Sequence, residues 1–316
     1  MSYTNFPGGI TSMGVPTFGA GGLLPFTGSY FWVNEAIGSD GNTGAANNPF
    51  ATLTQALLAV SNAPQSSSQT NVIFLTGTVH VSATVAWSLN NTWLVGLTSP
   101  SGNDRARISQ TGSTVFTPLV NVTGTGCGFI DIATFHGYAS ATTQICWAEA
   151  GGRNFYQNCQ FLGMANATAG AQAGGRSLTV AGSGENLFVG CTIGLDTVVR
   201  ATSNASLEFL SSTPRNKFYD CVFQMLTSSA SAVHVTVGAD GMDRYALFVR
   251  PSFLNAVEST STTISAAITA NASAGGFIGL QDLFSVGATA IATTGPVYGT
   301  GNIPTATTSG IAIKLT

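Results

Sequence analysis

The stretch Asn154-Phe155-Tyr156-Gln157-Asn158-Cys159-Gln160-Phe161 recurs along the chain and decides its fold. It returns as Asn186-Leu187-Phe188-Val189-Gly190-Cys191-Thr192-Ile193 and again as Lys217-Phe218-Tyr219-Asp220-Cys221-Val222-Phe223. Each copy has an apolar residue three positions before a cysteine and another two positions after it. The cysteines are 32 and then 30 residues apart, and self-similarity at a fixed period is typical of a repeat architecture.

Weaker copies continue the period. Residues 248–253 place Pro251 at the cysteine position, residues 277–284 place Asp282 there, and residues 129–135 are an early copy. The chain therefore contains five or six units of about thirty residues.

Each unit has the composition of short strands joined by tight turns. Its apolar residues alternate, and Gly, Asn and Ser lie between the alternating segments. We predict an all-β fold, a single-stranded right-handed parallel β-helix whose coils stack about 4.8 Å apart. Equivalent side chains then form a core ladder, for which we predict Cys159, Cys191, Cys221, Phe161, Ile193, Phe223, Phe253 and Phe284. The alternative is a β-propeller, but its blades need about forty residues.

Composition limits the function. Of the 316 residues 44% are hydrophobic and only 7% are charged, against roughly 25% in ordinary chains. The net charge is −3 and there is no basic run, which argues against a nucleic-acid partner. No apolar run is long enough for a membrane span, and Met1 to Asn5 do not begin a secretory signal. We expect synthesis in a host cytoplasm, and much of the weakly charged surface to be subunit interface, although such a solenoid could also stand alone.

The five cysteines form no Cys-x-x-Cys pair, which argues against a zinc site. Cysteines stacked in a parallel ladder are poorly aimed for a disulfide. We therefore predict buried free thiols.

Residues 1–29 are rich in Gly and Pro, with scattered apolar side chains. We predict an extended attachment arm that lies in a groove of a partner or of its own trimer; a disordered tail is the alternative. Its contact residues would be Phe6, Pro7, Ile10, Val15, Phe18, Leu23, Leu24 and Phe26.

Residues 30–69 are predicted to form the entry to the solenoid: a strand at 30–33, a loop at 38–44 and a capping helix. Asn48 is the predicted N-cap and Pro49 the first-turn residue, followed by Phe50, Leu53, Leu57 and Val60 on one face. The loop has some character of a calcium site but lacks the further acidic ligands, so we expect no metal. Residues 70–290 form the β-helix, and residues 291–316 form a C-terminal cap or strand.

Residues 30–97 resemble the N-terminal part of pectin-lyase-like β-helix proteins. The matching segments are Phe31-Trp32-Val33-Asn34, Gly38-Ser39-Asp40-Gly41-Asn42-Thr43-Gly44, Asn48-Pro49-Phe50-Ala51-Thr52-Leu53, Val72-Ile73-Phe74-Leu75-Thr76-Gly77-Thr78 and Leu94-Val95-Gly96. This opening is similar to one common in bacteriophage virion proteins, although secreted polysaccharide enzymes share it. The resemblance covers about a fifth of the chain, and it implies a homotrimer.

The sequence offers no clear catalytic centre. Polysaccharide hydrolysis needs two carboxyl groups at a set separation, whereas the thirteen acidic residues are scattered. The best local pair, Asp240 and Asp243, is interpreted as a turn with a surface ion pair. His80, His136 and His234 lie far apart in the sequence, and His234 alternates with valines, which predicts an outward position or a contact. We expect no catalytic residues, no metal and no cofactor.

We predict a structural phage virion protein that decorates or cements the capsid surface as a trimer and binds the major capsid protein through its arm. The alternative is a tailspike or fibre that binds or cleaves host polysaccharide. A third hypothesis, a secreted bacterial carbohydrate enzyme, is disfavoured by the missing signal sequence.

Overall fold

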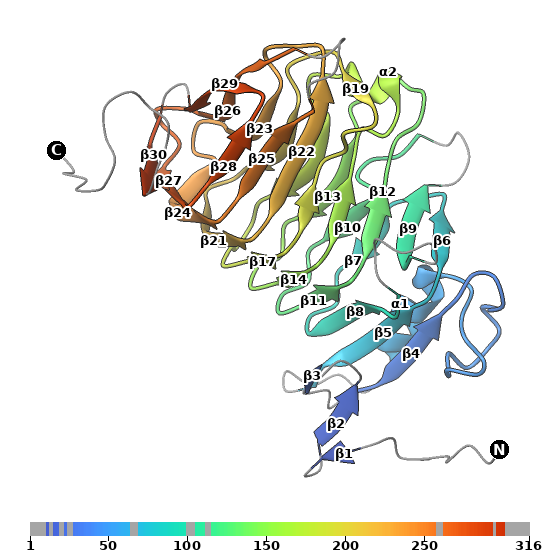
Figure 1. The fold of residues 1–316 in the computed structure, drawn as a ribbon. Coiled ribbons are helices and arrows are strands. Elements are labelled where there is room, and N and C mark those ends of the chain that lie inside the picture. Colours follow the sequence, from blue (N-terminus) through green and yellow to red (C-terminus); the bar gives the residue numbers. More distant parts are fainter. Residues whose placement is uncertain are drawn as a thin grey trace.

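The computed structural model describes residues 28–63, 69–98, 105–110, 115–256, 262–292 and 295–300. It also describes the backbone of three short strands before them, β1 (Thr11–Ser12), β2 (Val15–Phe18) and β3 (Gly22–Leu23). Three long parallel sheets run the length of the molecule, and each coil gives one strand to each sheet (Figure 1). The smallest of them has eight strands, so eight complete coils are described. The predicted parallel β-helix is confirmed, and the propeller is excluded.

The first sheet has ten strands. From the N-terminal end they are β4 (Tyr30–Val33), β5 (Asn71–Leu75), β8 (Thr92–Gly96), β11 (Gly128–Ile130), β14 (Phe155–Gln157), β17 (Leu187–Val189), β21 (Thr213–Tyr219), β24 (Met242–Val249), β27 (Gly276–Gln281) and β30 (Val297–Thr300).

The second sheet has nine strands. They are β6 (Thr78–Val81), β9 (Arg107–Gln110), β12 (Ala133–Phe135), β15 (Gln160–Leu162), β18 (Thr192–Ile193), β22 (Val222–Thr227), β25 (Ser252–Asn255) and β28 (Phe284–Val286), with β19 (Val199–Arg200) paired beside β22. The third sheet has eight, which are β7 (Val85–Trp87), β10 (Val120–Val122), β13 (Ile145–Glu149), β16 (Arg176–Val180), β20 (Ala205–Phe209), β23 (Val233–Val237), β26 (Ile264–Ala270) and β29 (Ala288–Ala292).

The core is a set of ladders. The apolar residue three positions before each cysteine forms an aromatic stack in which neighbouring ring centroids are 4.4–5.0 Å apart and nearly parallel. The stacked residues are Phe129, Tyr156, Phe188, Phe218 and Phe248. Phe161, Ile193, Phe223 and Phe253 form the predicted second ladder, and the thiols of Cys159, Cys191 and Cys221 are free and buried.

The last step of the predicted ladder is wrong by one residue. Phe253 pairs with Ser285, while Phe284 lies on the outside and is 59% exposed. Phe284 pairs with Ser252, and Ser252 directly follows Pro251, which holds the cysteine position of its coil. The cysteine position of the last coil is therefore held by Leu283, not by Asp282. A shift of one residue moves a side chain to the other face of a sheet.

One left-handed residue makes the turn from the first sheet to the second in six successive coils. These residues have φ between 50° and 63°, and they are Asp131, Asn158, Gly190, Asp220, Arg250 and Asp282. Gly, Asn and Asp tolerate this conformation best, which explains the composition of the repeat just before its cysteine position.

Helix α1 (Leu53–Asn62) lies at the N-terminal end and packs against the first coil, as predicted (Figure 1). It begins later than predicted: Thr52, not Asn48, is the N-cap, and its Oγ1 accepts a hydrogen bond from Gln55 N. The carboxylate of Asp40 accepts hydrogen bonds from the backbone of Ala51 and from Thr52. The loop at 38–44 therefore holds the residues at which helix α1 begins. A second helix, α2 (Ala167–Gly170), is a single turn.

The ladder of parallel strands extends beyond residues 70–290, since β4 and β30 are its first and last members. The preceding strands β1, β2 and β3 pair antiparallel. Residues 301–316 lie outside the described part of the chain. Within the described residues no helix has the length and hydropathy of a membrane span.

Candidate functional site

The outer face of the ten-stranded sheet carries two columns of side chains in strict register. Within each strand these residues alternate with inward-facing core residues, so their side chains face away from the core. One column is Tyr30, Val72, Trp93, Gly128, Phe155, Leu187, Lys217, Leu247, Gly279 and Tyr298. The other is Trp32, Phe74, Val95, Ile130, Gln157, Val189, Tyr219, Val249 and Gln281. Lys217 is the one charged residue in the two columns; we call this surface the apolar strip.

The N-terminal third of the apolar strip is buried. Val72, Phe74 and Val95 are buried in a cluster separate from the main core. The Trp93 ring lies over Gly128, where an added Cβ would be 2.3 Å from it, and it contacts the ring of Phe155 at a centroid distance of 6.2 Å. Glycine is therefore required at position 128 by close approach.

The middle and C-terminal parts of the apolar strip are partly accessible. On the same face, beside the strip, Phe277 is 43% exposed, and its ring lies 6.1 Å from that of Tyr245 and 5.9 Å from that of Tyr298. Leu187 and Leu247 are half-buried. A contiguous exposed apolar surface with a polar border marks an interaction site.

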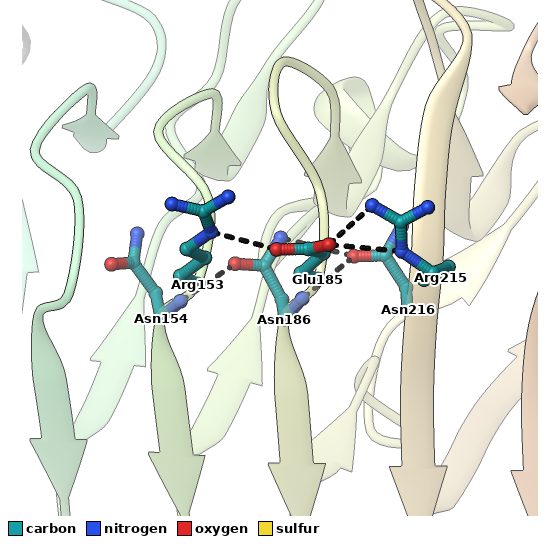
Figure 2. Close-up of polar contacts among 6 residues, drawn as sticks. All are labelled: Arg153, Asn154, Glu185, Asn186, Arg215 and Asn216. Atoms are coloured by element: carbon teal, nitrogen blue, oxygen red, sulfur yellow. Dashed lines mark hydrogen bonds and ion pairs between the residues drawn. The ribbon is translucent and has the colours of Figure 1, made fainter.

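One border of the apolar strip is a row of three charged residues, Arg153 and Glu185 just before β14 and β17, and Arg215 near the start of β21 (Figure 2). Glu185 Oε2 accepts a hydrogen bond from Arg153 Nε at 2.7 Å, and Oε1 accepts one from Arg215 Nε at 2.9 Å. These bonds, that of Arg153 first, lower the pKa of Glu185. The row has a net charge of +1 and is open to solvent.

Beneath this row lies a buried ladder of Asn154, Asn186 and Asn216 (Figure 2). Asn186 Oδ1 accepts from Asn154 N at 3.0 Å, and Asn186 Nδ2 donates to Asn216 Oδ1 at 3.0 Å. Asn154 Oδ1 accepts from Cys127 N at 2.7 Å. The side-chain amides thus satisfy turn backbone that the sheets leave unpaired, and they fix the turn that presents the charged row.

The opposite border is acidic. Arg250 binds Asp220 through two hydrogen bonds of 2.6 and 2.8 Å. The pKa of Asp220 is lowered, chiefly by the hydrogen bond from Arg250. Asp131 accepts a hydrogen bond from Asn158, and Asp282 is exposed.

Glu149 is an ionisable residue inside the core. It is 1% exposed, and burial raises its pKa to about 7. Its carboxylate accepts hydrogen bonds from the Tyr156 hydroxyl, from Asn154 Nδ2 at 3.0 Å and from Gly151 N at 2.9 Å. Since it is closed off from solvent, this carboxyl group is a structural element and not an accessible acid.

His234 was predicted to lie outward or in a contact, and the outward position is wrong. Its side chain is fully buried beside Arg200, and burial lowers the pKa of His234 to about 3. Arg200 is also buried; its guanidinium donates to Ser206 Oγ at 3.1 Å and to Gln224 O at 3.4 Å, and no described carboxylate pairs with it. Burial lowers the pKa of Arg200 to about 9. The alternation was misleading because two successive side chains of β23, His234 and Val235, are both buried.

Most acidic residues already have a partner within the chain. Nine of the thirteen accept a hydrogen bond or form an ion pair; they are Glu35, Asp40, Asp131, Glu149, Glu185, Glu208, Asp220, Asp243 and Asp282. Asp243 forms the predicted surface pair with Arg244, at 3.8 Å. Among the described residues no three His, Cys, Asp or Glu side chains are grouped to hold a metal ion.

The predicted arm residues belong to the segment before β4. Phe6, Pro7, Ile10, Leu24 and Phe26 lie outside the described residues. Val15, Phe18 and Leu23 belong to β2 and β3, of which the backbone alone is described.

Comparison with protein-family models gives no match, and comparison with curated proteins gives none. Among solved structures the chain is similar to a rhamnogalacturonan lyase, with a TM-score of 0.57 and 12% identity over 87% of this chain and 73% of that one. It is also similar to the pectate lyase Pel9A, with a TM-score of 0.50 and 12% identity over 88% of this chain and 82% of that one. At this identity the likeness establishes the pectin-lyase-like β-helix fold alone.

Proposed function

We propose that the protein is a non-enzymatic structural component of a bacteriophage particle, a β-helix that decorates or cements the capsid surface as a trimer. Residues 1–29 would be its attachment arm and the major capsid protein its partner. The observation that carries the structural role is the apolar strip, nineteen positions in register with one charge. The phage context is supported by the resemblance of residues 30–97.

The engaged carboxylates support the absence of catalysis. A glycosidase needs one carboxyl group free to act as an acid and a second free to attack or to activate water. Glu185 and Asp220 are held by arginines, and Glu149 is enclosed by the core. These side chains stabilise turns and core, so they do not supply such a pair.

The decoration role is tested by immunogold labelling of phage particles whose genome encodes this sequence, with antibodies raised against the purified chain. We expect label distributed over the capsid shell. Label confined to the tail tip would favour the second function below, and unlabelled particles would overturn the proposal.

The second candidate function is binding of a host surface polysaccharide. It is favoured by aromatic side chains of this face, since Trp93 and Phe155 in the strip and Phe277 beside it offer ring faces on which sugars could stack. The fold neighbours are polysaccharide lyases. Purified protein incubated with pectin, rhamnogalacturonan and bacterial lipopolysaccharide tests it. Retention on one of these matrices supports binding, and release of reducing ends would establish an enzyme.

A further inference from the structure

We infer that the apolar strip is where copies of this chain bind one another, side by side and parallel, with equal coils at equal height. This inference rests on the trimer of the proposed function but does not need the capsid. Its first support is chemical. Leu187, Leu247 and Val189 offer no hydrogen-bonding group, so the strip suits an apolar protein surface better than a sugar chain covered with hydroxyl groups.

The second support is the period of the surface. Strands of one sheet repeat every 4.7–4.9 Å, so the side chains of the strip form ridges at that spacing. Another copy of the chain carries ridges with the same spacing over the same length. Two parallel copies can therefore pack coil against coil from β8 to β30 without losing register, which a partner of unrelated shape cannot do.

The area of the apolar strip shows what else the interface needs. Seven intervals between the eight strands from β8 to β30 give a contact about 34 Å long, and three residues of a strand give a width of about 10 Å. Two copies would bury on the order of 700 Å² through the strip alone, below the roughly 1,000 Å² expected of a biological interface. A closed ring adds the contacts between the two charged borders to this area.

The borders fit such a ring. In the middle coils one border is the row Arg153–Glu185–Arg215, with a net charge of +1, and the other carries Asp131, Asp220 and Arg250, with a net charge of −1. In a ring of parallel copies opposite borders of neighbours meet, so Arg215 of one copy lies near the height of Asp220 of the next, since both belong to the β21 coil. Nearer the C-terminal end Asp240 and Asp243 offset Arg244, and there the apolar contact of Phe277 carries the interface.

Sedimentation equilibrium of the full chain tests the surface. We expect the wild type to sediment as an oligomer of the 32.2 kDa chain, and the double variant Leu187→Glu with Leu247→Glu to sediment as a monomer with an unchanged circular dichroism spectrum. The matched control is Thr236→Glu, an outward position on the eight-stranded sheet, which should remain oligomeric.

A monomeric wild type, or an oligomeric double variant, would overturn the inference. If the double variant does not fold, the milder Gln157→Glu, at an exposed position of the strip, is expected to weaken association at least tenfold; unchanged association of that variant would overturn it equally. None of these measurements involves a capsid, so failure here is distinct from unlabelled particles in the immunogold experiment.

The parallel arrangement has its own test, oxidation of Gln157→Cys. Equal heights place this residue near its counterpart in the neighbouring copy, so a covalent dimer is expected on a denaturing gel. The five native thiols are buried and leave the background low. Thr236→Cys is the control and should stay uncrosslinked. An oligomer that depends on Leu187 but does not crosslink at position 157 would overturn the parallel arrangement.

Discussion

The hydroxyl of Tyr156 donates a hydrogen bond to the carboxylate of Glu149 inside the β-helix core. Tyr156 is itself stacked between Phe129 and Phe188, at ring distances of 5.0 and 4.4 Å. A polar pair is thus built into the aromatic ladder, and its charge state is coupled to folding.

Glu149 should make the folded state less stable as the pH rises from about 4.5 to about 7. In this window the unfolded chain releases the Glu149 proton, whereas the folded chain retains it because burial has raised the pKa to about 7. The folded state then binds more protons, so the free energy of unfolding falls, by about 3 kcal/mol in total. Urea unfolding of the wild type and of Glu149→Gln across this range measures it: the difference between the two proteins should change by that amount, and a constant difference would contradict the prediction.

His234 should have the opposite effect on the acidic side. Its folded pKa of about 3 lies below its ordinary value of 6.5, chiefly through burial and then through the charge of Arg200. Its contribution to the free energy of unfolding is complete above pH 6.5. This contribution is lost as the pH falls towards 3, because His234 takes up a proton at higher pH in the unfolded chain than in the folded one. His234→Phe should therefore flatten the acid limb of the stability profile. His80→Phe, at an exposed histidine, is the control and should leave that limb nearly unchanged.

Arg200→Met should be neutral or stabilising at pH 7. The guanidinium is fully buried with two hydrogen bonds and no described carboxylate partner, and replacing a poorly compensated buried charge by an apolar side chain of similar volume often stabilises. Removing the charge should also raise the pKa of His234 and shift its acid limb upward in pH. Urea unfolding at pH 7 and pH 5 measures both effects. A decrease of more than about 3 kcal/mol in the free energy of unfolding at pH 7 would show that the guanidinium is instead well paired.

Asn186→Ala should destabilise the fold by about 2–3 kcal/mol. It leaves the buried Asn154 N–H without its partner, at a cost of roughly 1–3 kcal/mol, and removes one of the two hydrogen bonds that Asn216 Oδ1 accepts from residue 186. Arg153→Ala removes a neighbour in the same turn row whose side chain is 73% exposed, and exposed ion pairs contribute at most about 1 kcal/mol. Comparable losses in the two variants, measured by urea unfolding, would contradict the role assigned to the asparagine ladder.

The sequence predicts the core better than the surface because the repeat is read from core positions. The spacing of Tyr156, Phe188 and Phe218 before their cysteines is a direct consequence of stacking, and the structure confirms it. The apolar strip was also signalled, since segments such as Tyr30-Phe31-Trp32-Val33 are apolar on both faces, the pattern of a sheet covered on both sides. The environments of Glu149 and Arg200 were not predictable, because they depend on turns that bring distant residues together.

Phe253→Ala and Phe284→Ala form a matched pair that tests the register of the last coil. The sequence repeat assigned both residues to one ladder, but the left-handed turn at Asp282 places Leu283 inward and Phe284 outward. Phe253 is fully buried, so its truncation should cost about 3–5 kcal/mol. Phe284 is 59% exposed, and its truncation should change the stability by no more than about 0.5 kcal/mol. Urea unfolding of the two variants decides between the registers: equal large losses would restore Phe284 to the core ladder, whereas a loss confined to Phe253→Ala supports the turn at Asp282.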